Sequence, residues 1–303
     1  MTDQQKNSLS QESKQGKAPK IKKSKSFQAD AIRRFKKNPM GIIGLIIIGI
    51  FIFLAIFGEF ITPNDPFAMD IPRHHEEPSS EFLLGTDNFG RCVLSRIIYG
   101  ARISMLVGLT VIILRMLIGI PIGLVSGFYG GWVESILMRI VDVVIAFPGI
   151  ILALAIMAVR GQGLENVIIA LSATGWTTYA RLIRSEVLSL REREYVQAAK
   201  GVGFNNLKVM LRHILPNCLA SIIVYSTMTI AVVIIAEASL SFLGLGAAAR
   251  DATWGTQMSM ERDYLRYAWW GVTFPGAAIA IVVLGFNLLG DALRDVLDPR
   301  LKD

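Results

Sequence analysis

The apolar run MGIIGLIIIGIFIFLAIFGEFI, from Met40 to Ile61, constrains the fold more than any other stretch, because it carries no charged residue before Glu59. A helix of about 20 apolar residues crosses a bilayer core of about 30 Å. Hydrophobic residues make up 52% of the 303-residue chain, and they occur in blocks rather than at helical or strand spacing. These observations exclude an ordinary soluble domain and predict an all-α integral membrane protein.

Further apolar blocks follow, so the sequence predicts six transmembrane helices, the first at 40–61. Residues 62–103 contain several prolines and are expected to form an extracytoplasmic loop before a five-helix core at 104–291. The fourth span is the least apolar, because it contains Trp176, Thr177 and Thr178. The spans after the first are expected at Ser104–Gly127, Ile140–Val159, Leu164–Ile183, Leu219–Leu243 and Val272–Leu289.

The positive charge of the chain is concentrated before the first span. The net charge is +7, and 11 of the 31 Lys and Arg residues lie in the first 39 positions. Cytoplasmic segments of membrane proteins carry such an excess, so this tail is expected in the cytoplasm, with a lipid or nucleic-acid site as the alternative. Residues 1–39 have little apolar surface to bury and are predicted to be disordered. Six spans then place the tail at 292–303 in the cytoplasm too.

Small residues repeat in the second span. Gly119, Gly123 and Gly127 are spaced by four residues, and Gly108 lies further upstream. Small residues at this spacing let helix backbones approach closely in lipid, where no hydrophobic effect acts between helices. The pattern predicts a closely packed helix bundle.

Three charged residues are expected inside the spans, where an unpaired charge is costly. Arg115 falls near the middle of the second span, Asp142 lies near the start of the third, and Glu237 lies in the fifth. They are candidates for lining a translocation pathway. Internal pairing and a displaced span boundary are the alternatives.

The sequence offers no catalytic residue set. The only histidines are His74, His75 and His213, and no H-E-x-x-H pattern occurs. No glycine-rich phosphate-binding loop occurs either, so ATP and Mg²⁺ would bind another chain, and no cofactor is expected on this one. The run His74-His75-Glu76-Glu77 is expected to be loop surface, with metal contact as the alternative. Cys92 and Cys218 are too few for a disulfide framework and are expected to be free, on opposite sides of the membrane.

One amphipathic insert, Glu192–Asn217, separates the fourth and fifth apolar blocks. Gly203 is expected to end a first short helix at positive φ. Asn205 and Asn206 can cap a second helix, and Pro216 stops it or marks the entry to the next span. The insert is either a rigid cytoplasmic knob or an interfacial helix. Its apolar faces would be Tyr195, Ala198, Ala199 and Val202, then Leu207, Met210, Leu211 and Ile214.

The order Gln197-Ala198-Ala199, three residues, Gly203, then Leu215-Pro216 resembles the EAA loop of bacterial ABC importer permeases. Gln197 stands where the general motif has Glu, and His213 where Ile is common. The ending RHILPN is similar to that of the peptide/nickel branch. Other strings resemble the same branch: FLLGTDNFGRCVLSRIIYGARIS, MRIVDVVIAFPGIILALAI, ASLSFLGLG and FNLLGDALRDVLDPRLK. Cys92 departs from the usual Asp. The resemblance runs from about Ile32 to Asp303 and points to the C-type permease subunit.

The resemblance implies a type I ABC importer permease in a bacterial cytoplasmic membrane, forming half of the pore. It would pair with a second permease, two ATPase subunits and an extracytoplasmic binding protein, and it would import peptides, with nickel or a metallophore as the alternative cargo. The coupling loop at 185–217 would dock on the ATPase; a passive channel would need no such loop. The coupling residues implied are Glu194, Gln197, Ala198, Ala199, Gly203, Arg212 and Pro216.

Overall fold

The computed structural model describes residues 32–248 and 251–297, and no strand occurs within these ranges. The long helices are α3 (Pro39–Ile61), α4 (Val93–Tyr129), α7 (Leu164–Leu190), α10 (Leu215–Phe242) and α12 (Trp270–Leu297). The shorter helices are α5 (Gly131–Ile145), α6 (Gly149–Arg160), α8 (Glu194–Gly201), α9 (Asn206–Val209) and α11 (Trp254–Glu261). Single helical turns occur at Ile71–Arg73, Met210–Ile214 and Arg262–Tyr264. The expected all-α fold is therefore found.

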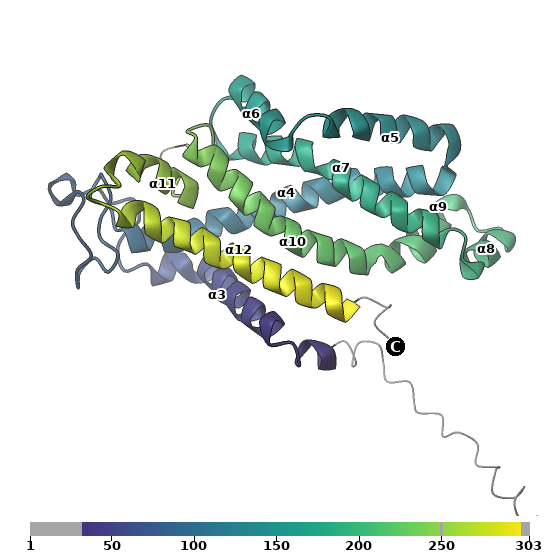
Figure 1. Cartoon of the computed structure of the whole chain (residues 1–303), viewed down its shortest axis with the longest axis horizontal. Helices are drawn as coiled ribbons and strands as arrows, with labels where there is room; N and C mark the ends of the chain where they lie inside the picture. Colours follow the sequence, from purple (N-terminus) through teal and green to yellow (C-terminus); the bar gives the residue numbers. More distant parts are fainter. Residues whose placement is uncertain (1–31, 249–250, 298–303) are drawn as a thin grey trace, which may run out of the picture.

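The long helices form one elongated bundle, and its two ends differ (Figure 1). The loop end carries the segment Thr62–Cys92 and α11. The hairpin end carries α8 and α9, together with the start of α3 and the finish of α12. Within the bundle α4 packs along α7, and α12 packs against both α3 and α10. Both ends of the described chain thus lie at the same end of the bundle as α8 and α9, as the predicted topology requires.

The glycine repeat of α4 is the reason that α4 and α7 pack so closely. A Cβ atom on Gly119, Gly123 or Gly127 would overlap α7, at Trp176 O, Ala180 O and the Val187 side chain respectively. Any larger residue at these positions would push the two backbones apart. The close packing predicted from the glycine spacing is confirmed.

Four helices, α3, α4, α10 and α12, are long and apolar enough to cross a membrane. The third predicted span is broken into α5 and α6, which are bent by 78° relative to each other. If this bent pair counts as one span, five spans are found. Pro148 lies at this break; a proline has no N–H to continue the helix. The fourth predicted span corresponds to α7, which is long enough to cross a membrane but less apolar than the other long helices. Helices α4, α5, α6 and α10 pack against α7, so less of its surface would face lipid. The six-span count remains a prediction.

Several boundaries differ from those expected. The second span belongs to a helix that begins at Val93 rather than Ser104, so the loop after α3 ends at Cys92. The first span agrees closely with α3, which begins at Pro39 and is capped by Asn38, whose Oδ1 accepts the Gly41 amide at 3.1 Å. Helix α12 continues to Leu297, into the expected C-terminal tail. Most of the expected disordered tail, residues 1–31, lies outside the described residues.

Candidate functional site

The hairpin at the end of α7 has the local structure predicted from its glycine and asparagine residues. Gly203 has φ +89°, a left-handed conformation, and its amide donates to Lys200 O at 2.9 Å. The following amide, of Phe204, reaches back to Ala199 O at 3.3 Å and closes the end of α8. Asn205 caps α9, because its Oδ1 accepts the Lys208 amide at 2.8 Å. Two short helices joined at Gly203 are therefore confirmed.

An apolar cluster anchors the hairpin to its own bundle. Val196 and Ala199 of α8 and Val209 of α9 are buried in it. Of the expected apolar face of α8 only Ala199 is buried, whereas Tyr195, Ala198 and Val202 are exposed. Val196 is the inward residue that the sequence did not single out. The cluster is completed by Leu124 and Phe128 of α4, Ile183 and Val187 of α7, Met210, Ile214, and Cys218 and Ile222 of α10.

Two polar side chains hold α8 to the ends of α7 and α4. Gln197 Nε2 donates to Arg191 O at 2.8 Å, and Arg191 Nη1 donates to Gly127 O at 2.9 Å. Gln197 occupies the position where the resembling family has Glu, and its amide makes a bond that a carboxylate could not donate. The hairpin is therefore a fixed extension of the bundle.

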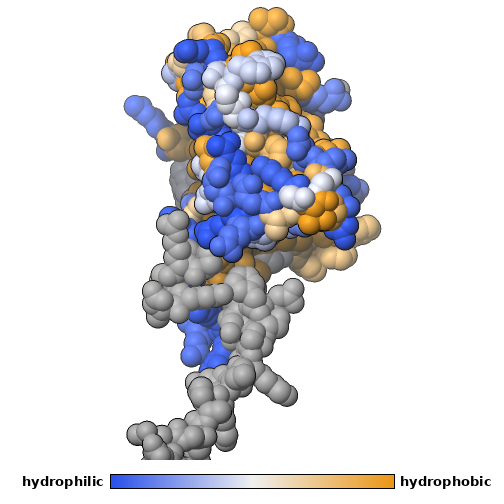
Figure 2. Space-filling view, turned by 90° about the vertical axis from the view of Figure 1, so that its right-hand side faces the viewer, coloured by the Kyte–Doolittle hydropathy of each residue, from blue (hydrophilic) through white to orange (hydrophobic). Residues whose placement is uncertain are grey.

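The outer surface of the hairpin is exposed and mixed in character. A shallow hollow there is lined by Asn205, Leu207, Lys208, Leu211, Arg212 and Pro216. Glu194 is also exposed. Figure 2 looks onto this end and shows hydrophilic side chains over most of it, with apolar groups between them. Such a surface suits a partner that offers both apolar and charged groups.

The backbone between α9 and α10 forms a π-helical turn, Met210–Ile214. His213 stacks on Phe204 with ring centroids 5.8 Å apart, and Lys208 Nζ lies 4.0 Å from the centroid of the same Phe204 ring. π-helical turns inside α-helices occur frequently at functional sites. Within this turn Leu211 and Arg212 are exposed beside the hollow, whereas Met210 and Ile214 are buried.

The three charged residues expected in the spans do not contact one another. Arg115 of α4 is buried and donates from Nε and Nη2 to Leu171 O of α7 at 3.0 and 2.7 Å. Asp142 of α5 pairs with Arg181 of α7 at 2.6 Å, and both side chains are about half exposed. Glu237 of α10 is fully buried and accepts from Ser241 Oγ at 2.8 Å. Each therefore lies in a different setting.

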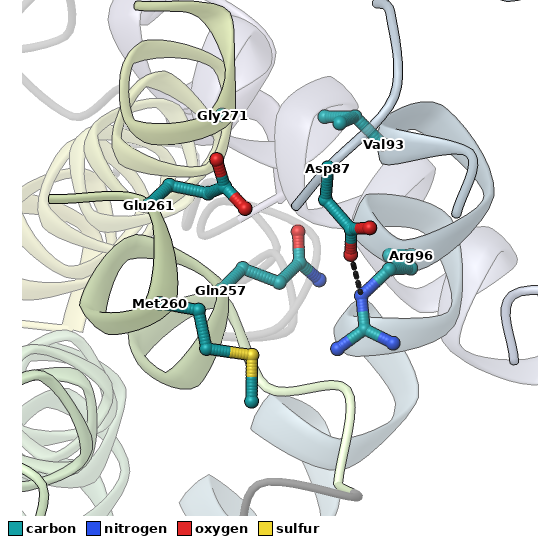
Figure 3. A pocket seen from close by; sticks show the side chains of 7 residues that line it. All are labelled: Asp87, Val93, Arg96, Gln257, Met260, Glu261 and Gly271. Atoms are coloured by element: carbon teal, nitrogen blue, oxygen red, sulfur yellow. Dashed lines mark ion pairs between the residues drawn. The ribbon is translucent and has the colours of Figure 1, made fainter. Parts of the chain in front are cut away.

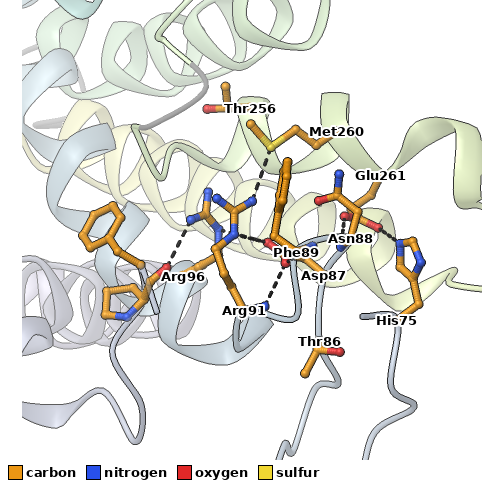
Figure 4. A network of polar contacts seen from close by, with 12 residues as sticks. His75, Thr86, Asp87, Asn88, Phe89, Arg91, Arg96, Thr256, Met260 and Glu261 are labelled. Atoms are coloured by element: carbon orange, nitrogen blue, oxygen red, sulfur yellow. Dashed lines mark hydrogen bonds and ion pairs between the residues drawn. The ribbon is translucent and has the colours of Figure 1, made fainter. Parts of the chain in front are cut away.

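A buried charge network at the loop end was not expected from the sequence (Figure 4). Asp87 Oδ2 pairs with Arg91 Nε at 2.6 Å, and Arg96 Nε lies 3.7 Å from the same oxygen. All three side chains are buried. In Figure 3 Asp87 and Arg96 face Gln257 and Met260 of α11 across a small cavity. The network joins the loop to the start of α4 and, through Arg91 Nη2 and Met260 Sδ at 3.5 Å, to the end of α11.

Glu261 of α11 connects the same loop to the bundle. Its Oε1 accepts the Asn88 amide at 2.8 Å, and its Oε2 lies 3.0 Å from His75 Nε2. Burial raises the pKa of the Glu261 carboxyl, and the Asn88 amide and His75 oppose that rise. His74 and Glu77 are exposed as expected for a loop, but the His75 side chain is turned inward onto Glu261.

Cys92 and Cys218 are both free and buried, at the starts of α4 and α10. Among residues 32–248 and 251–297, no group of three His, Cys, Asp or Glu side chains is placed to hold a metal ion.

Comparison with known proteins agrees with this geometry. The family described as binding-protein-dependent transport system inner membrane component matches residues 119–303, and the N-terminal TM domain of oligopeptide transport permease C matches residues 26–78. The dipeptide transport system permease protein DppC of Alkalihalophilus pseudofirmus is 44% identical over 273 residues, 90% of each chain. The oligopeptide transport system permease protein OppC of Bacillus subtilis is 41% identical over 288 residues, 95% of this chain and 94% of that one.

Among solved structures, the MetNI methionine ABC transporter in inward-facing conformations shares the fold. Its TM-score is 0.55 at 19% identity, covering 67% of this chain and 97% of that chain. The family match covers more than half of the chain, and the predicted role as a transport subunit rather than an enzyme agrees with it. This multi-pass membrane protein belongs to the family of binding-protein-dependent transport system inner membrane components, the permease subunits of ABC importers.

Proposed function

We propose that this chain is the permease subunit of an ATP-driven importer of dipeptides or oligopeptides. The observation that carries the proposal is its 41–44% identity, over about nine tenths of its length, to permeases named for dipeptide and oligopeptide transport. A relative named for glutathione, itself a small peptide, is 41% identical. Nickel, the alternative from the sequence, is not favoured by these names.

The orientation follows from charge. The hairpin end faces the cytoplasm, because the basic tail precedes α3, which begins at that end, and the hairpin itself is rich in basic residues. The loop end then faces outward, where an extracytoplasmic binding protein would deliver cargo. A second permease completes the pore, and two ATPase subunits, which hold ATP and Mg²⁺, lie beneath the hairpin. These partners are those of the ABC importer family.

The hairpin is the coupling element. Its exposed residues, Ala198 of α8 and Arg212 and Pro216 beside the hollow, would contact the ATPase, with Glu194 as a further polar contact. The buried cluster and the Gln197–Arg191–Gly127 bonds would transmit movement to α4 and α7. ATP binding and hydrolysis would bias the bundle between two packed states as a rigid-body change.

Two of the charged span residues keep a proposed place near the translocation route. Asp142 lies on α5 shortly before the Pro148 break, and its half-exposed pair with Arg181 suits a wetted surface. Glu237 is enclosed, and its bond to Ser241 favours internal pairing over direct contact with cargo. Arg115, the third, is considered in the next subsection.

The coupling role is tested by a matched glycine pair. Gly203 and Gly201 both have open space where a Cβ would stand, but only Gly203 has positive φ. A β-branched residue in that conformation strains the turn by about 1–2 kcal/mol or more. Gly203→Val should therefore reduce ATP-driven peptide uptake strongly while the protein stays in the membrane at normal abundance. The matched control Gly201→Val, at a helical position, should have a much smaller effect.

Uptake, ATPase activity and membrane abundance would be measured together in cells that lack the native chain. Normal uptake by Gly203→Val at normal abundance would contradict the coupling assignment. Uptake unaffected by loss of the whole chain would contradict the peptide importer itself.

A further inference from the structure

Arg115 is a buried cation without an acidic partner. Its side chain belongs to the middle of α4, and the residue is 7% exposed. It forms no ion pair within residues 32–248 and 251–297, and the titratable groups within electrostatic range are the phenols Tyr179 and Tyr225. A charged residue inside a membrane bundle is costly and usually functional, facing a partner or a water-filled route. The described part of the chain supplies no such anion.

The bonds that Arg115 makes use only one edge of its guanidinium. Nε and Nη2 both donate to a single acceptor, Leu171 O, which also accepts from Thr174 Oγ1 at 3.1 Å. Two of the five N–H donors of an arginine are thereby used. Nη1 forms no hydrogen bond within the described residues, and it is not among the enclosed polar atoms. The edge formed by Nη1 and Nη2 is left available, and this edge can bind a carboxylate with two parallel hydrogen bonds.

Neighbouring residues position the guanidinium. Gly175, one turn after Leu171 on α7, has no side chain, and a Cβ there would overlap the guanidinium carbon of Arg115. The guanidinium therefore lies directly against the α7 backbone. The ring of Tyr225 on α10 packs edge-on against the ring of Tyr179, with ring centroids 4.9 Å apart. The Tyr179 hydroxyl is hydrogen-bonded to Ser226 Oγ at 2.9 Å. The Tyr225 carbonyl accepts from Thr229 Oγ1, but the Tyr225 hydroxyl forms no hydrogen bond in the described part of the chain and is a further available donor.

We infer that Arg115, set against Gly175 and assisted by Tyr225, binds the carboxylate of the cargo during its passage through the transporter. This inference rests on the proposed function and deepens it, since every unmodified peptide carries a C-terminal carboxylate. The competing role is a purely structural one, in which Arg115 only fixes α4 to α7. A structural role explains the contact with Leu171 O but not the unused edge of the guanidinium. Loss of a purely structural bond would reduce the uptake of every cargo alike.

The test compares one tripeptide with a free C-terminal carboxylate and the same tripeptide as its C-terminal amide. Uptake by the full transporter would be measured for each at several concentrations, normalised to the wild-type rate for the same peptide. Arg115→Met should reduce uptake of the free-acid peptide about tenfold or more at low concentration, as the loss of a charge-assisted pair predicts. Uptake of the amide should stay within about twofold. Arg115→Lys, which keeps a single charge without the planar edge, should fall between.

Gly175→Ala provides a second route to the same result with Arg115 retained. The added methyl should displace the flexible end of Arg115, so the variant should again lose the free acid selectively. An equal loss of both peptides in Arg115→Met and Gly175→Ala, at normal abundance, would assign Arg115 a structural role and overturn the inference. No loss of either peptide would also overturn it. If the wild-type transporter takes up neither peptide, the proposed function fails first and this inference falls with it.

Discussion

The loop end and the hairpin end of this bundle are held together by different forces. At the loop end, buried charges join the segment Thr62–Cys92 to α4 and α11, with Asp87 between Arg91 and Arg96 and with His75 on Glu261. At the hairpin end, an apolar cluster anchors α8 and α9, and the charged groups Glu194, Lys208 and Arg212 stay on the surface. The same chain therefore uses charge as interior structure at one end and as exterior surface at the other.

The two kinds of interaction have different consequences for how firmly each end is fixed and for which groups it exposes. A buried ion pair adds little net stability, but removing one partner is costly, so it strongly disfavours other arrangements of the loop. An apolar anchor tolerates small changes in packing and leaves the exposed charges free to meet another protein. The loop end is accordingly the more rigidly determined end, whereas the hairpin end keeps its charged side chains exposed.

The largest expected effect comes from breaking the buried network with an isosteric change. Asp87→Asn removes the charge that Arg91 and Arg96 share without changing the size of the side chain. Loss of one partner of a buried pair costs about 3–5 kcal/mol, so the thermal transition of the purified protein in detergent should fall clearly.

The matched control is Glu59→Gln. The Glu59–Arg102 pair has the same 2.6 Å separation as Asp87–Arg91, but its side chains are 60% and 54% exposed. Exposed pairs contribute about 0–1 kcal/mol, so this variant should be nearly as stable as the wild type. Similar destabilisation by both changes would mean that burial does not distinguish the loop end.

A second expected effect distinguishes a residue that anchors the hairpin from a neighbouring residue on its exposed surface. Ile214 is fully buried in the apolar cluster, whereas Leu211, three residues earlier, is 50% exposed beside the hollow. Ile214→Ala should lower the free energy of unfolding by about 2–5 kcal/mol. Leu211→Ala should change it by less than about 0.5 kcal/mol and should instead weaken association with the ATPase subunits. Unfolding in denaturant and co-purification with those subunits measure the two quantities. Equal effects of both variants on stability would contradict the division into anchor and surface.

Local features of the sequence predicted much of this arrangement. The position of α3, the close approach of α4 to α7 at Gly123, and the turn at Gly203 all follow from residues near one another in the chain. The break before α6 also had a local signal, because Pro148 interrupts an apolar run, but the hydropathy of the block concealed it. Hydropathy alone likewise undervalued α7, whose Ser172, Trp176 and Thr177 are buried against other helices.

The loop-end network could not be predicted in this way. Glu261 meets His75 and Asn88 across more than 170 residues of sequence, and nothing near either segment specifies the other. The inward turn of Val196 was missed for a related reason. Residues on both sides of α8 are apolar, and only the position of the α4 and α7 ends decides which side is buried. Periodicity identifies a face, while the tertiary fold selects its partner.

The smallest expected effect lies on the outer surface of the loop end and depends on pH. Arg73 donates to Glu76 and Glu81, two bonds to each carboxylate at 2.6–2.9 Å, and these bonds lower the pKa of both carboxyls. A lowered pKa means that the stabilisation is present above the ordinary value of 4.5 and is lost as the pH falls through the folded-state values. Arg73→Met should therefore speed backbone hydrogen exchange in Ile71–Phe82 at neutral pH, relative to wild type. The difference should shrink in acid.

One part of that difference should not shrink. The Arg73 guanidinium also lies 4.4 Å from the centroid of the Phe82 ring, and this cation–π contact does not require a charged carboxylate. The remaining difference at low pH, compared in high and low salt, separates the ring contact from the screened ion pairs. Arg266→Met, a charge loss at the same end of the molecule, serves as control and should leave exchange in this segment unchanged. A difference that stays constant from neutral to acidic pH would assign the whole effect to the Phe82 contact. The ion pairs that stabilise the loop end would then be the buried ones alone.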